Sequence, residues 1–107
     1  MPKTYRRKQV ATINGTEINL MPTKGMKEAA ERYREFKKEG RKGGTEVAAI
    51  RATQILSGNE LSPDVVVEMA AWFARHAVDK KAEGFRPGEK GYPSPGKVAN
   101  LAWGGSA

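Results

Sequence analysis

The residues with the clearest potential for chemistry are cations near the start of the chain. Guanidinium and ammonium groups contact phosphates, and glycines beside them let a phosphate backbone approach closely. We therefore predict that nine cations bind the backbone of a nucleic acid: Arg6, Arg7, Lys8, Arg32, Arg34, Lys37, Lys38, Arg41 and Lys42. Tyr5 could stack on a base or sugar beside the first three. A disordered terminus is the open alternative for that N-terminal arm.

The distribution of charge along the chain supports this interpretation. Residues 1–42 contain twelve Lys or Arg and five Asp or Glu, whereas residues 43–107 contain seven of each, so the formal net charge of +7 lies in the first segment. Clustered positive charge attracts polyanions, and counterion release strengthens the attraction to phosphate. The competing interpretation is a solvated surface that keeps the protein soluble.

Residues that could perform catalysis are few. His76 is the single histidine and lies three residues before Asp79, so the two side chains could form a general base oriented by a carboxylate. Catalysis would also need a nucleophile or a metal, and one histidine without cysteine is a poor ligand set. Asp79 and Arg75, four residues apart, are better explained as an ion pair. We expect no enzymatic activity, no metal site and no cofactor.

The elements that position these residues are predicted to be mainly α-helical, about four helices after a small β-hairpin. Alternating apolar residues on both sides of Asn14-Gly15 predict the hairpin over residues 8–21, because this dipeptide suits a type I′ turn. Apolar residues at helical spacing, capping residues and terminal glycines predict helices over residues 23–39, 45–57, 63–83 and 94–103.

The relative packing of these helices is predicted from their apolar content. The first helix carries Tyr33 and Phe36 on its inner face, and Gly40 to Gly44 would form a mobile basic loop after it. Val47 is assigned to the inner face of the second helix. The third helix is the most apolar, so we expect it to be the central packing helix, covered by the aromatic segment from Phe85 to Trp103.

A helix-turn-helix function for the second and third helices is disfavoured. A recognition helix exposes Arg, Asn or Gln at its N-terminal end, whereas the third helix begins with Asp64, three valines and Glu68. The chain has the length of a single domain, residues 1–107, with a basic arm and hairpin in residues 1–22 and a helical body in residues 23–107. No apolar run is long enough to span a membrane, so we expect no membrane partner.

Several short runs, in order, are similar to a module of phage and prophage proteins. They are Gly43-Gly44-Thr45, Arg51-Ala52-Thr53-Gln54, Leu61-Ser62-Pro63, Met69-Ala70, Phe73-Ala74-Arg75-His76, Val78-Asp79-Lys80-Lys81, Gly91-Tyr92-Pro93-Ser94 and Trp103-Gly104-Gly105. The module occurs alone and attached to head-assembly proteins. Asn100 departs from it, since a second tryptophan is expected there. The resemblance implies a phage setting and no particular site residues.

Together, charge and resemblance predict a small, non-catalytic, phage-type accessory or virion protein that binds nucleic acid through its basic first third. DNA is favoured over RNA, and the expected location is the virion or the host cytoplasm. The alternative is a protein-interaction module, either a structural or cement piece of a capsid or an inhibitor of a host protein. Oligomer formation is left open.

Overall fold

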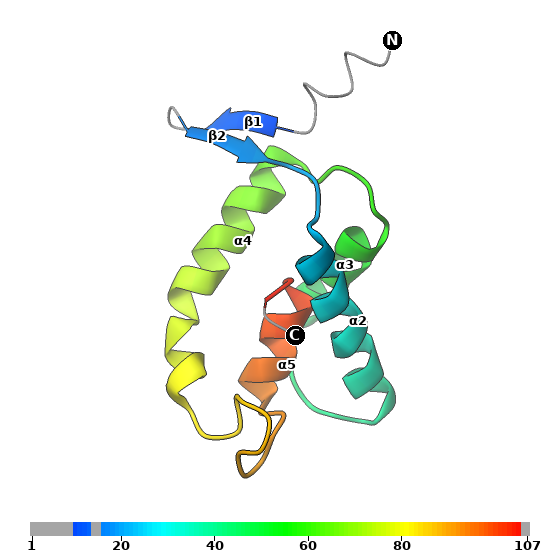
Figure 1. Cartoon of the computed structure of the whole chain (residues 1–107), viewed down its shortest axis with the longest axis vertical. Coiled ribbons are helices and arrows are strands. Elements are labelled where there is room, and N and C mark those ends of the chain that lie inside the picture. The colour runs from blue at the N-terminus through cyan, green and yellow to red at the C-terminus, as the bar shows by residue number, and fades with distance from the viewer. Residues whose placement is uncertain (1–9, 14–15, 106–107) are drawn as a thin grey trace.

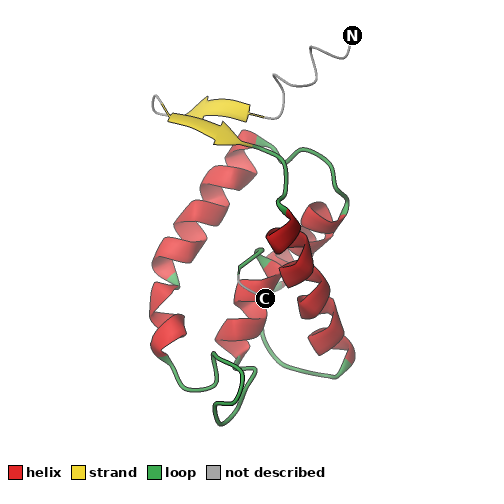
Figure 2. Ribbon diagram, viewed as in Figure 1, coloured by secondary structure: helices red, strands yellow, loops and turns green. Residues whose placement is uncertain are grey.

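The computed structural model describes residues 10–13 and 16–105, which form two short strands and a mainly helical body (Figures 1 and 2). The elements in chain order are β1 (Val10–Ile13), β2 (Thr16–Asn19), α2 (Lys24–Lys38), α3 (Glu46–Leu56), α4 (Pro63–Arg75), the 3-10 helix η1 (Ala77–Lys81) and α5 (Pro95–Ala102). The prediction of a mainly α-helical fold with four α-helices is confirmed for this part of the chain.

The two strands lie at one end of the molecule. They pair antiparallel, with Val10 opposite Asn19 and Ile13 opposite Thr16. The proposed turn at Asn14-Gly15 lies outside the described residues, so the type I′ hairpin remains a prediction. Beyond the strands, Leu20 is buried and its carbonyl accepts a hydrogen bond from the Leu61 N–H, which links this segment to the start of α4.

All four α-helices begin where the sequence predicts, because each has a hydroxyl at its N-cap. The side chains of Thr23, Thr45, Ser62 and Ser94 each accept a hydrogen bond from the backbone N–H three residues later, at 3.1 to 3.3 Å. Each bond satisfies a donor that has no partner within the helix. The starts are therefore determined by local sequence.

The centre of the fold is α5, not the third predicted helix. Val98, Leu101 and Ala102 are completely buried, and α5 packs against both α2 and α3. In α4 only Met69 and Trp72 are buried. The prediction that the third helix would be central is wrong because α4 is apolar around most of its circumference, so its composition does not indicate which side faces the core.

The third helix is also shorter than predicted. It ends at Arg75, and His76 leaves helical geometry with φ −103° and ψ 13°. The His76 ring stacks on Trp72 at 4.3 Å between centroids, and its Nδ1 lies 3.0 Å from the Trp72 carbonyl oxygen. The chain then turns through η1, so the prediction of a helix to residue 83 is wrong. The interactions of His76 with Trp72 stabilise this ending.

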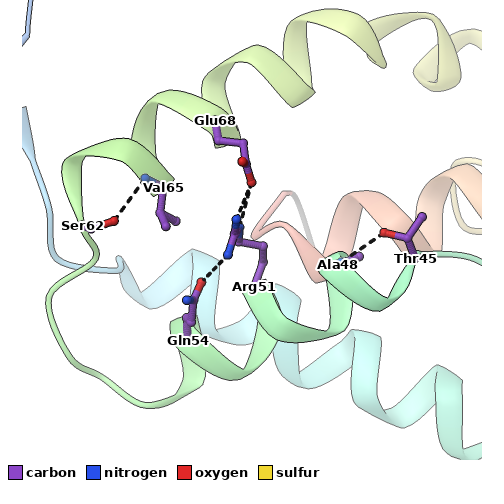
Figure 3. A network of polar contacts seen from close by, with 7 residues as sticks. All are labelled: Thr45, Ala48, Arg51, Gln54, Ser62, Val65 and Glu68. Atoms are coloured by element: carbon purple, nitrogen blue, oxygen red, sulfur yellow. Dashed lines mark hydrogen bonds and ion pairs between the residues drawn. The ribbon is translucent and has the colours of Figure 1, made fainter.

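A polar and aromatic network attaches α4 to the rest of the molecule (Figure 3). The Arg51 side chain on α3 donates to the Glu68 carboxylate on α4, with Nε 3.1 Å from Oε1, and also to Gln54 Oε1 at 3.0 Å. Its guanidinium lies 5.5 Å from the centre of Trp103, which in turn stacks on Trp72 at 5.2 Å. Trp103 thus covers α4 as predicted.

The other aromatic residues of the C-terminal segment pack elsewhere. Tyr92 meets Phe36 of α2 edge to face at 5.9 Å, and Phe85 is buried. The segment therefore bridges α2 and α4, where the sequence predicted that it would cover only the third helix.

The loop between α2 and α3 is less open than predicted. A Cβ on Gly43 would lie 2.4 Å from the Pro95 carbonyl oxygen, and one on Gly44 would lie 3.4 Å from the Tyr33 ring. Both glycines therefore allow the loop to pack against the protein itself. The absence of a side chain at these two positions is thus explained by packing within the protein, and close approach of a phosphate backbone stays a prediction.

Candidate functional site

The described residues bring four cations from separate segments to the N-terminal end of α5. We call them the Lys97 cluster: Arg32 on α2, Lys80 on η1, Arg86 on the following loop and Lys97 on α5. Only Arg32 belongs to the cations predicted as binding residues. The other three lie in the part of the chain whose total charge is zero.

Lys97 is the centre of this cluster and is unusually buried for a lysine. It is the third residue of α5, its backbone N–H donates to the Ser94 hydroxyl, and the residue is only 4% exposed. The ammonium lies 4.8 Å from the centre of the Phe85 ring, within the range of a cation–π contact. The helix cap and the aromatic ring together fix its position.

Arg86 and Lys80 are held together by backbone contacts. The Arg86 guanidinium donates to the Lys80 carbonyl oxygen at 3.0 Å. Glu89 organises the same loop by accepting from the backbone N–H groups of Arg86 at 2.9 Å and Gly84 at 3.1 Å. These bonds, that of Arg86 first, hold the pKa of the Glu89 carboxyl below its usual range. These hydrogen bonds therefore fix the conformation of the loop that carries Arg86.

The electrostatics of the Lys97 cluster act on Lys97 itself. Burial lowers the pKa of Lys97, and the positive charges of Lys80, Arg32 and Arg86 lower it further. These effects disfavour the charged form of Lys97. The Asp79 carboxylate, beside Gly96, places a negative charge at the same end of α5. The excess of positive charge is suited to an anion such as phosphate.

Arg32 is the member of the cluster that lies on α2. Its guanidinium lies 5.0 Å from the centre of Phe36 and 3.5 Å from the Glu35 carboxylate. The side chains of Arg32 and Glu35 are 50% and 62% solvent-exposed, so this ion pair is weak and is screened by the solvent. Arg32 can exchange it for a phosphate contact at little cost.

The remaining predicted binding residues do not form one continuous basic face. Arg34 donates to the Thr53 hydroxyl at 3.2 Å, and Lys37 donates to the carbonyls of Arg41 and Gly43 at 3.1 and 3.2 Å. Arg41 is ion-paired with Glu39 at 3.5 Å. These three cations thus also stabilise the end of α2 and the loop that follows.

Acidic residues interrupt the outer face of α2. Arg34 and Lys38 line a shallow depression in which Glu31 and Glu35 also take part. Lys38 and Lys42 are exposed and make no hydrogen bond or ion pair with another described residue. Arg6, Arg7 and Lys8 lie outside the described residues. The cations on the outer face of α2 therefore alternate with carboxylates.

The residues considered for catalysis are not arranged as a pair. The His76 ring lies against Trp72, whereas the Asp79 side chain lies beside Gly96, 3.1 Å from the place where a Cβ would be. The proposed Arg75–Asp79 ion pair is absent from residues 16–105, so that prediction is wrong. Asp79 is drawn to the start of α5, where the N-terminal dipole of the helix favours a carboxylate.

Two further features concern the described part of the chain alone. It contains no group of three or more His, Asp or Glu residues arranged to hold a metal ion. None of its helices combines the length and the apolar character required to cross a membrane.

Sequence reasoning missed Lys80, Arg86 and Lys97 because they lie far apart in the part of the chain where acids and bases are equal in number. They converge because the chain reverses direction after α4 and because Glu89 fixes the loop that follows. Neither feature can be recognised from the order of charged residues in the sequence. The one usable signal was Ser94-Pro95, which places Lys97 in the first turn of a helix. Comparisons with protein-family models, with curated proteins and with solved structures give no match.

Proposed function

We propose that this chain is a small, non-catalytic accessory protein of phage type that binds the phosphates of nucleic acid, DNA in preference to RNA, in the virion or the host cytoplasm. The Lys97 cluster is the observation that carries the proposal. Lys38 and Lys42, both exposed, and the cations Arg6, Arg7 and Lys8 extend the basic character of the chain beyond it. The phage setting rests on the sequence resemblance alone.

The physical argument is that the positive charges of the Lys97 cluster would attract a phosphate. The charges of three cations act on the nearly buried Lys97 ammonium and lower its pKa, and a phosphate placed among the four would favour their charged forms. The contacts would go to backbone oxygens, which position a protein on nucleic acid without reading its sequence. The proposed binding is therefore independent of sequence.

Binding of a fluorescent 20-base-pair duplex, followed by anisotropy as salt is varied, tests this function. Three to four phosphate contacts predict a slope of about −3 for log affinity against log salt concentration, or roughly a 50-fold loss between 50 and 200 mM. A slope near zero would contradict nucleic-acid binding. A single-stranded DNA and an RNA duplex, measured in parallel, test the preference for DNA.

A pair of double variants tests whether the Lys97 cluster makes these contacts. Lys80→Gln with Arg86→Gln removes two cluster cations and should reduce the size of the slope by about 2. Lys24→Gln with Lys27→Gln removes the same charge from the first turn of α2 and should change the slope less. Equal effects would show that only total charge matters and would remove the assigned site.

A protein-interaction function is the second candidate, because α4 exposes apolar residues such as Val67. In that case a capsid component or a host protein would bind this helix. A pull-down after nuclease treatment distinguishes the two functions. A partner retained after digestion would favour protein interaction.

A further inference from the structure

Helix α4 forms one edge of the molecule (Figure 1). Apolar residues lie on its outer side. Val67 is 45% exposed, and Ala70, Ala71 and Ala74 are also exposed. These residues recur at spacings of three and four, so they lie on one side of the helix, opposite the buried Met69 and Trp72. We call them the α4 outer face. No charged side chain interrupts it.

An apolar face of this kind is unusual on a helix at the surface. Surface helices normally place charged residues opposite the core, and α2 does so with Glu28, Glu31 and Glu35. A helix that is apolar on both sides normally has a partner on each. Only the inner side of α4 has one among the described residues.

Charges at the two ends of α4 indicate what the partner is. Asp64 lies in the first turn and Arg75 in the last, eleven residues apart. Eleven residues are close to three full turns, so both side chains lie on the same flank of the outer face, about 16 Å apart. Neither forms an ion pair within residues 16–105. The midpoint between this acid and this base lies between Met69 and Ala70, and Glu68, on the same flank, is already paired with Arg51.

We propose that the α4 outer face binds the same face of a second copy of this chain, antiparallel, about a twofold axis that passes near Ala70. A twofold axis perpendicular to the helices leaves the charged flanks of both copies on the same side of the contact and makes the two helices run in opposite directions. Asp64 of each copy therefore meets Arg75 of the other. The alanines near the crossing allow the two helices to approach closely, and Val67 of each copy becomes buried. An unrelated partner would have no reason to match this symmetric pattern.

The experiment measures the mass of the nuclease-treated full chain by sedimentation equilibrium from 1 µM to 1 mM. We expect a concentration-dependent dimer. Ala71→Glu places a charge at the crossing and should weaken dimerisation at least 10-fold, whereas Ala49→Glu, on an exposed position of α3, should not. A monomer across the whole range, or equal effects of the two variants, would overturn the proposal.

A charge exchange tests the antiparallel arrangement. Asp64→Arg and Arg75→Asp each create two contacts between like charges and should each weaken the dimer about 10-fold. The double variant should restore it, because the pairs are re-formed with reversed sign. Circular dichroism confirms that each variant is folded. A folded double variant as weak as the single ones would overturn the arrangement. No nucleic acid is present, so failure here is distinct from failure of phosphate binding.

Discussion

Lys97 occupies a position that is unusual for a lysine. It is almost fully buried beside Phe85, yet other cations lie near it. Burial and repulsion both disfavour its charged form, and proteins normally avoid such positions. Asn100 is a second buried polar residue of α5, and its side-chain oxygen has no hydrogen-bond partner. The resemblance to the phage module predicts a tryptophan at position 100. In this chain Gly105 packs closely against the Asn100 side chain.

Replacing Lys97 by Met should raise the melting temperature at pH 7. Removing this buried charge should raise the free energy of unfolding by about 1 kcal/mol. In a domain of this size, that corresponds to a rise in melting temperature of about 4 to 8 °C. The lost contact with Phe85 is partly replaced, because methionine also packs on aromatic rings. Thermal unfolding by circular dichroism measures the effect, and Lys90→Met, at an exposed position, is the control with little expected change.

The same variant has a distinctive pH dependence. The pKa of Lys97 is lower in the folded protein than the ordinary value of 10.5, so the unfolded chain binds its proton more tightly. The wild-type penalty is complete below the folded pKa and vanishes as the pH rises towards 10.5. The advantage of Lys97→Met should therefore shrink between pH 7 and pH 10. A constant difference would show that packing, and not charge, is responsible.

At the scale of elements, the starts of helices could be predicted and their packing could not. A hydroxyl, often followed by proline, marks each start, as at Ser62-Pro63 and Ser94-Pro95. The end of α4 at His76 depends on its stacking against Trp72, which no local signal indicates. Val47 was assigned to the core side of α3 but is 45% exposed, because the buried side of α3 is formed by Ala48, Ala52 and Ile55.

Loss of Arg51 should loosen α4 while leaving the other helices intact. The Arg51 side chain is 14% exposed and joins Glu68, Gln54 and Trp103. Arg51→Ala should cost about 1 to 2 kcal/mol, since it removes charged hydrogen bonds that are partly shielded from water. Hydrogen exchange should be faster in α4 than in wild type and unchanged in α2 and α5.

A matched variant separates this network from an ordinary surface ion pair. Arg41→Ala removes an exposed pair with Glu39 and should cost about 0 to 0.5 kcal/mol, without faster exchange in α4. If Arg51→Ala caused equal acceleration in every helix, α4 would not be a separately attached element. Arg51→Lys should not restore protection, because an ammonium cannot reproduce the planar contacts of a guanidinium.

At the scale of the whole molecule, segments far apart in the sequence determine both the core and the candidate site. The partition of charge along the chain identified a basic first third, but the Lys97 cluster takes three of its four cations from the remainder. Such convergence depends on tertiary packing, which neither composition nor helical periodicity contains. The mainly helical class depends on local signals, and it could therefore be predicted from the sequence.

The contact between the α2–α3 loop and α5 should be critical for the whole fold. Gly43 has φ +135°, and a Cβ there would lie 2.4 Å from the Pro95 carbonyl oxygen and 2.8 Å from the Val98 Cβ. Backbone atoms cannot move aside cheaply, so Gly43→Ala should cost at least about 3 kcal/mol. Gly40 has φ +83° with nothing within 4 Å, and Gly40→Ala should cost only about 1 kcal/mol.

Denaturant unfolding of the two glycine variants gives the comparison. Because Gly43 lies against the start of α5, its replacement should destabilise all helices together, unlike Arg51→Ala, which should loosen one. It should also weaken DNA binding, since Pro95 and Lys97 share the first turn of α5. Equal stability of the two variants would mean that the loop can move away from α5 freely. The position of Lys97 would then not depend on that loop, and the Lys97 cluster would have to be held by Phe85 and the Ser94 cap alone.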